Sequence, residues 1–271
     1  MLSFPNCKIN IGLFITQKRA DGYHNLETVF YPFPWKDVLE IIPSGEATNL
    51  VLSGKKVEGE TDNNLVLKAF DLLQKDFPAQ VKSLQIFLRK IIPMGAGLGG
   101  GSSDGAFMLQ LMNEYFELGL SNEKLAHYAL QLGSDCPFFI YNTPQFASGR
   151  GEIFQSVNLD LSAYSIQLIC ADVHVSTRDA FQLIKPKPAC FSLKEIEGLA
   201  IENWREKVFN DFEEPVFAAH PVLKKIKEQL YDAGALFASM SGSGATVYGI
   251  FPKRKKATRE LPVSFDSFYV E

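Results

Sequence analysis

A glycine-rich segment is the part of this sequence whose residue types point most directly to a chemical role. Six glycines and two adjacent serines lie within PMGAGLGGGSSDGA, residues 93–106. The apolar stretch LQIFLRKII precedes this segment and a run of helix formers follows it, so we predict a strand, a glycine loop and a helix in succession. Backbone N–H groups at the start of such a helix attract phosphate, and the missing Cβ atoms let phosphate oxygens reach them. A tight loop that needs glycine for its own conformation is the alternative interpretation.

The better-known nucleotide-binding motifs do not account for this segment. Gly95, Gly97 and Gly100 match the spacing G-x-G-x-x-G, but a dinucleotide-binding unit also needs a second strand that ends in an acidic residue. Glu114 and Glu117 lie instead within a continuing helical pattern. The P-loop motif is absent, because SGKKV lacks its spacing and its hydroxyl residue, and the H-R-D and D-F-G motifs of protein kinases are absent too. The segment therefore indicates a less common nucleotide-binding loop.

The composition indicates a globular protein and excludes several classes of partner. The chain has 271 residues, of which 46% are hydrophobic and 21% are charged, and this length suits two domains. A formal net charge of −4 gives no general attraction to nucleic acid or to an anionic membrane surface. No apolar run approaches the roughly 20 residues of a membrane span, and the N-terminus lacks the pattern of a signal peptide, so we expect a cytoplasmic protein. The basic run KRKK, residues 253–256, is expected to be solvated surface.

Cysteine and histidine spacing offers no metal site and no disulfide framework. Cys7, Cys136, Cys170 and Cys190 are scattered without a C-x-x-C pair, and the four histidines are equally dispersed. We therefore predict no protein-held metal and reduced thiols.

The elements that must position a site follow from the periodicity of apolar residues. Alternation from Cys7 to Ile15 predicts a strand that carries Lys8 and Asn10 together on its other face. We predict further strands at DVLEII, SLQIFLRKII, IQLICADV, ATVYGIF and SFDSFYVE, and helices at NNLVLKAFDLLQKDF, SSDGAFMLQLMNEYFELGL, SNEKLAHYALQLG, residues 193–209 and residues 215–233. This mixture predicts an α/β or α+β fold with a domain boundary near residues 155–162, which divides the chain into 1–157 and 158–271.

Four segments together resemble a known family. PMGAGLGGGSSDGA is similar to the phosphate-binding loop of the GHMP small-molecule kinases, which are named for galactokinase, homoserine kinase, mevalonate kinase and phosphomevalonate kinase. KINIGLFITQKRADGYHNLETVF, LGSDCPFFI and SGSGATVYGIF extend the resemblance, in the family's order, from about residue 5 to residue 251. The resemblance implies a two-domain GHMP kinase fold, with an N-terminal ATP-binding domain and a C-terminal ferredoxin-like substrate domain.

The resemblance implies roles for residues around the transferred phosphoryl group. Asp135 of GSDCPF matches the family's catalytic aspartate, which accepts the proton of the attacking hydroxyl, and Lys8 matches the active-site lysine, which keeps Asp135 ionised and offsets charge. Without the resemblance, Asp135 would be taken for a turn residue, and Lys8 and Asn10 for a solvated strand face. The residues expected to bind ATP are Pro93, Gly95, Gly97, Leu98, Gly99, Gly100, Gly101, Ser102 and Ser103, with Asn64 and Lys90 toward the adenosine, and with Gly242, Ser243 and Gly244 in a loop that closes over the phosphates.

A second set of residues is implied for the acceptor substrate. RADGYH, residues 19–24, carries most of the specificity within the family, and Tyr23 and His24 with Phe181 are expected to hold a cytosine ring. Thr177 and Asn10 are expected to contact the substrate as well. The implied reaction is phosphorylation of the 2-hydroxyl of 4-diphosphocytidyl-2-C-methyl-D-erythritol by ATP with Mg²⁺. Taken singly, Tyr23 and Phe181 would more often be ordinary core or surface aromatics.

Some alternatives stay open on the sequence alone. Asp104 places a carboxyl beside the predicted phosphates, where it could favour the helix dipole, join a magnesium shell or point away. Arg150 could contact a phosphate or lie on the surface. Another GHMP kinase, or a nucleotide-binding regulator on an inactive kinase fold, remains a rival interpretation, although the presence of both Lys8 and Asp135 argues against the regulator. Either a monomer or a homodimer is compatible with the sequence.

Overall fold

The computed structural model describes residues 1–56, 63–255 and 265–271. They form two compact units, each of which takes several segments of the chain. The first unit consists of residues 1–8, 32–94 and 99–143, and the second of residues 9–31, 95–98 and 144–271. The predicted boundary between residues 157 and 158 stays a prediction. It divides the chain at a single point, whereas the segments of these two units alternate along the sequence.

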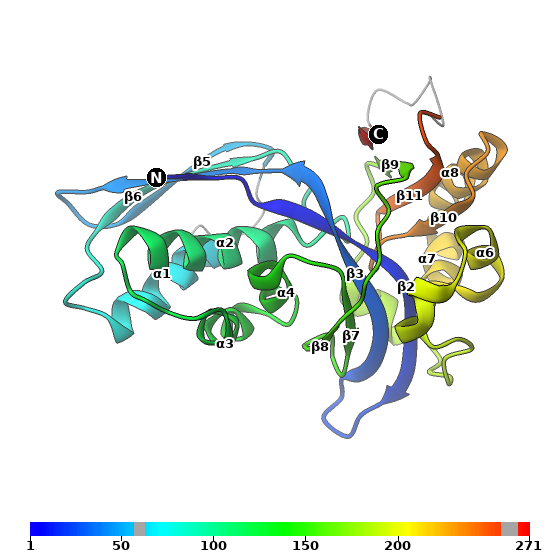
Figure 1. Cartoon of the computed structure of the whole chain (residues 1–271), viewed down its shortest axis with the longest axis horizontal. Coiled ribbons are helices and arrows are strands. Elements are labelled where there is room, and N and C mark those ends of the chain that lie inside the picture. Colours follow the sequence, from blue (N-terminus) through cyan, green and yellow to red (C-terminus); the bar gives the residue numbers. More distant parts are fainter. Residues whose placement is uncertain (57–62, 256–264) are drawn as a thin grey trace. The chain divides into compact units, whose positions relative to one another are not determined.

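The first unit is built on a sheet with helices on one face. The strands follow the order β1 (Leu2–Ser3), β4 (Val38–Pro43), β6 (Leu84–Lys90) and β5 (Asn49–Gly54). Only the β5–β6 pair is parallel, so the sheet is mixed. Figure 1 shows that the helices of this unit lie on the same face of the sheet; they are α1 (Leu65–Asp76), α2 (Gly100–Tyr115), α3 (Asn122–Leu132) and α4 (Cys136–Tyr141). The predicted helices that correspond to α1, α2 and α3 are confirmed.

Local signals set the ends of these helices. The Asn64 side chain caps α1 by accepting a hydrogen bond from Val66 N at 3.0 Å, and Ser121 caps α3 in the same way. Helix α2 begins at Gly100 because Gly99, at φ +68°, turns the chain from the glycine loop into the helix. It ends at Tyr115, earlier than the predicted end near Gly119.

Two long strands take part in both units. Strand β2 (Asn6–Lys18) confirms the predicted strand at Cys7–Ile15, and it lies in a second sheet in the order β2, β3 (His24–Lys36), β7 (Gln145–Ser148) and β8 (Ile153–Ser156). Residues 6–15 of β2 are all buried, on both faces. The face that carries Lys8 and Asn10 is therefore not a solvated strand face.

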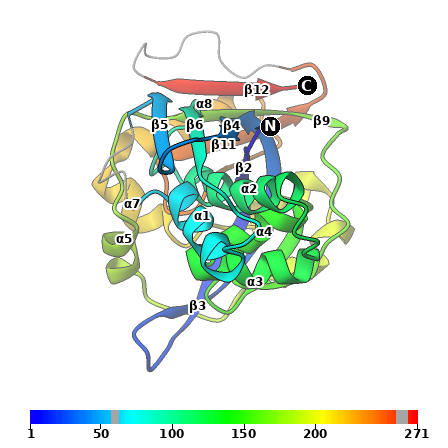
Figure 2. The same cartoon turned by 90° about the vertical axis from the view of Figure 1, so that its left-hand side faces the viewer.

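The second unit contains an antiparallel sheet of the predicted ferredoxin-like type. Its strands are β9 (Tyr164–Cys170), β10 (Phe237–Met240), β11 (Thr246–Pro252) and β12 (Asp266–Val270). They lie in the order β10, β11, β9, β12, so the first and third strands of the four are neighbours in the middle. Figure 2 shows β12 along β9 at one edge.

Helix assignments in the second unit correct two predictions. The predicted helix at 193–209 is mostly a series of short 3₁₀ turns, Leu193–Gly198 and Ile201–Asn203, followed by the single turn α6 (Trp204–Lys207). The predicted helix at 215–233 is two helices, α7 (Glu213–Ala219) and α8 (Pro221–Asp232), because Pro221 disfavours a helical conformation at His220. The short helix α5 (Thr177–Leu183) carries Thr177 and Phe181.

A continuous hydrophobic core supports the second unit. Leu13 and Ile15 of β2 pack in it together with residues of α8 and of the β10–β11 hairpin, such as Leu223, Ala238 and Val247. This core thus joins β2 to α8 and to the β10–β11 hairpin.

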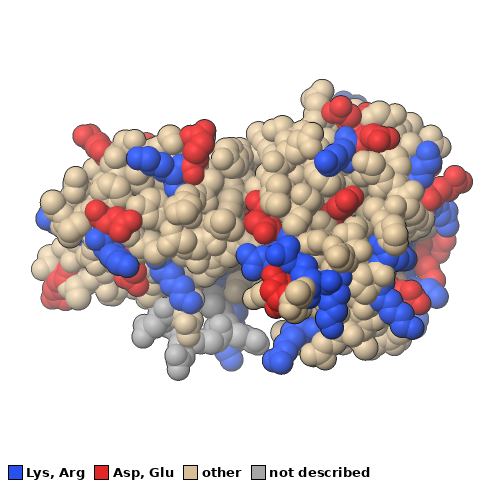
Figure 3. Space-filling model, turned by 90° about the horizontal axis from the view of Figure 1, so that it is seen from below, with Lys and Arg blue, Asp and Glu red and all other residues tan. Residues whose placement is uncertain are grey.

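Surface charge and helix length bear on possible partners. Basic and acidic side chains are intermingled on the face drawn in Figure 3, in line with the small net charge. Within the described part of the chain, no helix combines the length and apolar character needed to cross a membrane.

Candidate active site

Lys8 and Asp135 form an ion pair within the first unit. Lys8 Nζ lies 3.7 Å from Asp135 Oδ2, and the Lys8 side chain is 4% exposed whereas that of Asp135 is 35% exposed. Asp135 immediately precedes α4, and Lys8 comes from β2. Burial lowers the pKa of the Lys8 ammonium, and the Asp135 carboxylate opposes this shift. The pair thus presents its carboxylate toward solvent and keeps its cation behind it, an arrangement suited to accepting a proton from a bound hydroxyl.

Neighbouring side chains crowd two of the three glycines at the start of α2. A Cβ on Gly99 would lie 3.1 Å from Phe139 Cζ and 3.2 Å from Lys8 Cε, and one on Gly100 would lie 3.0 Å from Ile92 Cγ2. A Cβ on Gly101 would meet nothing within 4 Å. Gly101 is therefore the glycine at the start of α2 whose backbone faces open space, where a phosphate oxygen could approach.

The two serines of the loop lie in different surroundings. Ser103 is buried, and its Oγ has no hydrogen-bond partner among the described residues. Ser102 is half-buried, and its side chain hydrogen-bonds to Cys136. Burial raises the pKa of the Cys136 thiol to about 12, so this cysteine is not a nucleophile beside Asp135.

Lys90 takes part in a buried charge cluster that the sequence did not reveal. Its Nζ donates to Asp37 Oδ2 and, at 2.6 Å, to Asp104 Oδ2. Asp37 Oδ1 in turn accepts from the backbone of Ile91 and Ile92, directly before the glycine loop. The cluster therefore ties the end of β6 to the first turns of α2. Contact of Lys90 with adenosine stays a prediction, and would have to use the remaining N–H of an ammonium that is almost fully enclosed.

Asp104 points into this cluster, which decides among the possibilities left open by its sequence position. The residue is 2% exposed and bonded to Lys90, so it does not lie at a surface where it could join a magnesium shell. Burial raises its pKa to about 8. Its Oδ1 has no partner among the described residues.

In the second unit, the first glycine loop packs against the second small-residue loop. A Cβ on Gly97, which has φ +75°, would lie 2.0 Å from the carbonyl oxygen of Ser241. Ser241 Oγ donates to Gly97 O at 2.9 Å, and Thr246 N donates to Ala96 O at 3.2 Å. The backbone that approaches Gly97 so closely is thus protein, not ligand. Gly95 is the glycine of residues 95–98 around which a Cβ would meet nothing within 4 Å.

Residues 241–245, which we call the closing loop, lie beside other predicted site residues. Ser243 Oγ and Thr177 Oγ1 share a hydrogen bond of 2.9 Å. Asn10 N donates to Ser241 Oγ at 3.1 Å, and a Cβ on Gly242 would lie 3.4 Å from Asn10 Oδ1. The Asn10 side chain also donates to Thr28 Oγ1, so Asn10 supports the closing loop from β2.

The RADGYH segment forms a braced hairpin turn between β2 and β3. Arg19 Nε donates to both carboxylate oxygens of Asp21, Arg19 Nη1 donates to Asn25 Oδ1, and Asp21 Oδ1 accepts from Tyr23 N. The brace presents Tyr23, which is 57% exposed, to solvent. The Arg150 guanidinium lies 5.0 Å from the centre of the Tyr23 ring, which places Arg150 over an aromatic face.

His24 and Phe181 are brought together from β3 and α5. Their rings are stacked, with centroids 5.2 Å apart and planes at 20°. Partial burial, and to a lesser extent the charge of Lys18, lowers the pKa of His24, which favours the neutral imidazole. A neutral imidazole beside a phenyl ring is a surface on which a nucleobase can stack and be hydrogen-bonded.

Several residues that organise the site carried no signal in the sequence. Asp37 is the single residue between β3 and β4. Asn210 and Glu213 lie between the two helices predicted at residues 193–209 and 215–233. Their partners are tens of residues away along the chain, so only long-range packing reveals them.

The comparisons with known proteins agree in family and in reaction. Residues 64–143 match the N-terminal domain of GHMP kinases, and residues 191–261 match the C-terminal domain of GHMP kinases. A Bacteroides fragilis protein named 4-diphosphocytidyl-2-C-methyl-D-erythritol kinase is 53% identical over 262 residues, which cover 96% of this chain and 95% of that protein. A Bacteroides thetaiotaomicron protein of the same name is 53% identical over 93% of this chain and 92% of its own length.

A solved structure is similar over most of the chain. The crystal structure of a 4-(cytidine 5'-diphospho)-2C-methyl-D-erythritol kinase superposes with a TM-score of 0.77 at 29% sequence identity, and the match covers 92% of this chain and 90% of that one.

Proposed function

The chain belongs to the GHMP kinase family, and we propose that it phosphorylates 4-diphosphocytidyl-2-C-methyl-D-erythritol with ATP as the phosphoryl donor. The observation that carries the proposed chemistry is the Lys8–Asp135 pair, with its exposed carboxylate and buried ammonium. The relatives' shared name supplies the substrate.

In the proposed reaction, Asp135 receives the proton of the acceptor's 2-hydroxyl group. The hydroxyl oxygen attacks the γ-phosphorus, the bond from that phosphorus to the β–γ bridging oxygen breaks, and ADP leaves with the bonding electron pair. The products are the 2-phosphate and ADP, and Asp135 returns its proton to solvent. Lys8, 3.7 Å away, orients the Asp135 carboxylate and offsets negative charge during transfer.

The start of α2 is the proposed site for the phosphates of ATP. This 16-residue helix places the positive end of its dipole at Gly100–Ser103, and Gly101 leaves open space there. Pro93 and Leu98 shape the loop in this proposal, Gly95 offers a second open backbone, and Gly242, Ser243 and Gly244 of the closing loop complete the phosphate contacts. The Asn64 side chain caps α1 by accepting from Val66 N, and its proposed contact with adenosine would use its amide N–H groups.

Magnesium is proposed to arrive with ATP as part of the substrate. Among the described residues no group of three or more His, Cys, Asp or Glu side chains could hold a metal ion. Phosphate oxygens and water, which are the ligands that Mg²⁺ commonly keeps at such sites, would then supply most of its coordination.

The cytosine ring is proposed to bind at Tyr23, His24 and Phe181. Tyr23 offers an exposed aromatic face, and the neutral His24 imidazole can both donate and accept a hydrogen bond at the edge of the base. Thr177, which shares α5 with Phe181, and Asn10 lie beside the closing loop and are proposed to contact the substrate. This reaction belongs to the non-mevalonate route to isoprenoid precursors, and we propose a cytoplasmic enzyme that acts as a monomer or homodimer.

The deciding experiment measures ADP release by the purified protein with Mg²⁺ and ATP. We expect selective turnover of 4-diphosphocytidyl-2-C-methyl-D-erythritol over mevalonate, homoserine and galactose, with competition by CMP or CDP. Selective turnover of another acceptor would contradict the proposed substrate and leave the kinase family intact. Tight ATP binding without turnover of any acceptor would favour the nucleotide-binding regulator instead.

A further inference from the structure

The segment Asn210–Glu213, which we call the NDFE segment, runs from the loop after α6 to the first residue of α7 and contacts the closing loop. It contains polar side chains that the proposed reaction does not use. Asn210 is 4% exposed, although a carboxamide in an ordinary loop is usually solvated.

Asn210 uses its whole amide on the backbone around the closing loop. Its Nδ2 donates to Met240 O at 2.7 Å and to Gly242 O at 2.8 Å, while its Oδ1 accepts from Phe212 N at 3.0 Å. The two carbonyls lie on either side of Ser241 along the chain. An aspartate at this position would have the same shape but no N–H group for either carbonyl.

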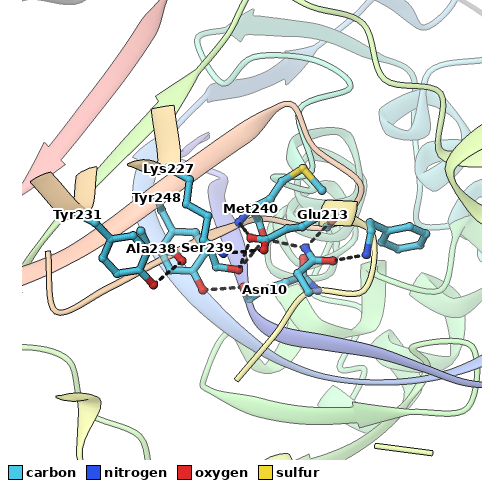
Figure 4. Close-up of polar contacts among 11 residues, drawn as sticks. Asn10, Glu213, Lys227, Tyr231, Ala238, Ser239, Met240 and Tyr248 are labelled. Carbon is cyan, nitrogen blue, oxygen red and sulfur yellow. Dashed lines mark hydrogen bonds and ion pairs between the residues drawn. The ribbon is translucent and has the colours of Figure 1, made fainter. Parts of the chain in front are cut away.

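Glu213 holds the same backbone from the other side. Its Oε1 accepts from Met240 N at 2.9 Å and from Ser239 Oγ at 3.1 Å, and its Oε2 accepts from Lys227 Nζ at 2.6 Å. Figure 4 shows Lys227, Ser239 and Met240 converging on this carboxylate. Met240 is therefore fixed at both its N–H and its carbonyl.

Ser241, which lies between Met240 and Gly242 in the chain, connects this backbone to the first glycine loop by a hydrogen bond. Ser241 Oγ donates to Gly97 O at 2.9 Å and accepts from Asn10 N at 3.1 Å. Tyr248, which follows the closing loop on β11, donates to Asn10 O at 2.9 Å. The closing loop is thus held between the NDFE segment and Gly97.

The NDFE segment is itself anchored to β2 and to the proposed base pocket. Asp211 Oδ2 accepts from Ile15 N at 2.8 Å, and Asp211 N donates to Leu13 O at 2.8 Å. The Phe212 ring packs edge-on against Phe181 with centroids 4.8 Å apart. The position of the NDFE segment is therefore fixed by hydrogen bonds to β2 and by packing against Phe181.

We propose that Asn210 and Glu213 are positioning residues, which hold the backbone of Met240–Gly242 so that the closing loop keeps the geometry that ATP phosphates need. This inference rests on the proposed function, because it assigns the closing loop to the phosphates. Neither side chain touches ATP in this proposal; both act through Met240 and Gly242.

Asn210→Asp tests the inference with a side chain of equal size. It removes two buried donors and sets a carboxylate against two carbonyls, so we expect the KM for ATP to rise about 10-fold or more. We expect the KM for the cytidylyl substrate to change much less, since Phe212 and Phe181 keep their packing. Asn203→Asp, on an exposed asparagine of the same region, is the matched control and should leave both constants unchanged.

A merely structural role would give a different result. It would lower the thermal midpoint and the fraction of active protein, and hence kcat, while the KM for ATP stayed at the wild-type value. A folded Asn210→Asp protein with the wild-type KM for ATP would therefore overturn the inference.

If Asn210→Asp does not fold, the variant Glu213→Gln tests the inference instead. It keeps one carbonyl acceptor and loses the ion pair with Lys227, and we expect about a 3-fold rise in the KM for ATP. The exposed Glu214→Gln is its control, and a wild-type KM for ATP in folded Glu213→Gln would overturn the inference.

Direct binding of a non-hydrolysable ATP analogue, measured by calorimetry, separates this inference from the proposed function. Wild-type protein that binds the analogue but does not phosphorylate the cytidylyl substrate would refute the proposed function. Weakened analogue binding by Asn210→Asp would still support the positioning role in that case, and unchanged binding would refute it.

Discussion

The two members of the Lys8–Asp135 pair differ in their access to water, and this difference separates their roles. Asp135 is partly exposed at the start of α4, where the proposed reaction brings a substrate hydroxyl, whereas Lys8 is enclosed and in that proposal acts through Asp135 and through its charge. Each side chain can therefore be tested by a change that leaves its surroundings in place.

Asp135→Asn should abolish proton acceptance while it retains the shape of the side chain. We expect kcat to fall about 100-fold or more, with ATP-analogue binding unchanged, because the amide cannot take the hydroxyl proton. Steady-state ADP release and calorimetric binding measure the two effects. Asp232→Asn, on an exposed aspartate of α8, is the control. Near wild-type turnover in Asp135→Asn would show that Asp135 is not the proton acceptor.

Lys8→Met should separate activity from stability. Burial lowers the pKa of Lys8, so the folded protein bears a cost for this charge, and a methionine of similar length removes that cost. The partner Asp135 stays partly hydrated. We expect a free energy of unfolding equal to or above that of the wild type, and a kcat at least about 100-fold lower. Urea unfolding and ADP release check this split, and retained turnover would refute the role of Lys8.

At the scale of elements, the glycines of residues 93–106 serve two different needs. Gly97, Gly99 and Gly100 are glycines because protein atoms occupy the space of a Cβ. Gly95 and Gly101 meet no protein atom there. The positive φ of Gly95, +63°, already favours glycine, whereas Gly101 lies in α2 without such a conformation and leaves its backbone open to a ligand. One loop thus combines close packing between elements with the proposed phosphate site.

Gly97→Ala and Gly101→Ala should have opposite effects on stability. Alanine at 97 would clash with Ser241 O and adopt a positive φ, so we expect a loss of about 2 kcal/mol or more. Alanine at 101 lies in the first turn of α2 and should stabilise by about 0.5 kcal/mol, yet raise the KM for ATP. Thermal unfolding and KM measurements check both. A stable Gly97→Ala protein, or a Gly101→Ala protein with the wild-type KM, would contradict this division.

At the scale of the whole molecule, the cluster of Lys90, Asp37 and Asp104 links charge to stability. It ties β6 to α2 around the glycine loop and is almost entirely buried. One ammonium faces two carboxyl groups, so a proton retained on Asp104 leaves the cluster neutral.

The stability of the protein should therefore depend on pH through Asp104. The pKa of Asp104 is about 8 in the folded protein against 3.8 ordinarily. Between these values the folded protein keeps a proton that the unfolded chain releases, so this contribution to stability is complete below the lower value and is lost as pH rises through the higher one. Asp104→Asn lacks this dependence.

Urea unfolding of wild type and Asp104→Asn at a series of pH values measures this effect. We expect the wild type to lose stability relative to the variant as pH rises from about 5 to about 8, with a slope of up to about 1.4 kcal/mol per pH unit. Asp71→Asn, on the exposed face of α1, should show no such trend. A constant difference between wild type and Asp104→Asn across this range would contradict the assignment.

Some elements were predictable from local patterns and others were not. The alternation at Cys7–Ile15 and the helical periodicity and caps of α1 and α3 depend on neighbouring residues, and these elements are confirmed. Residues 193–209 have a helical composition but fold mostly as 3₁₀ turns, in which Leu193 and Ile196 are buried. There, packing of a few apolar side chains outweighs local propensity.

Motif residues and their spacing were enough to indicate the family, the glycine loop and Lys8 and Asp135 as candidate partners, because both are properties of the chain alone. The packing of the folded chain places Ser241 in the space beside Gly97, encloses Lys90 between Asp37 and Asp104, and sets Asn210 and Glu213 against the backbone around the closing loop. These contacts join residues between 14 and 144 positions apart. A side chain's partner at such separations depends on how elements pack, and no local pattern encodes it.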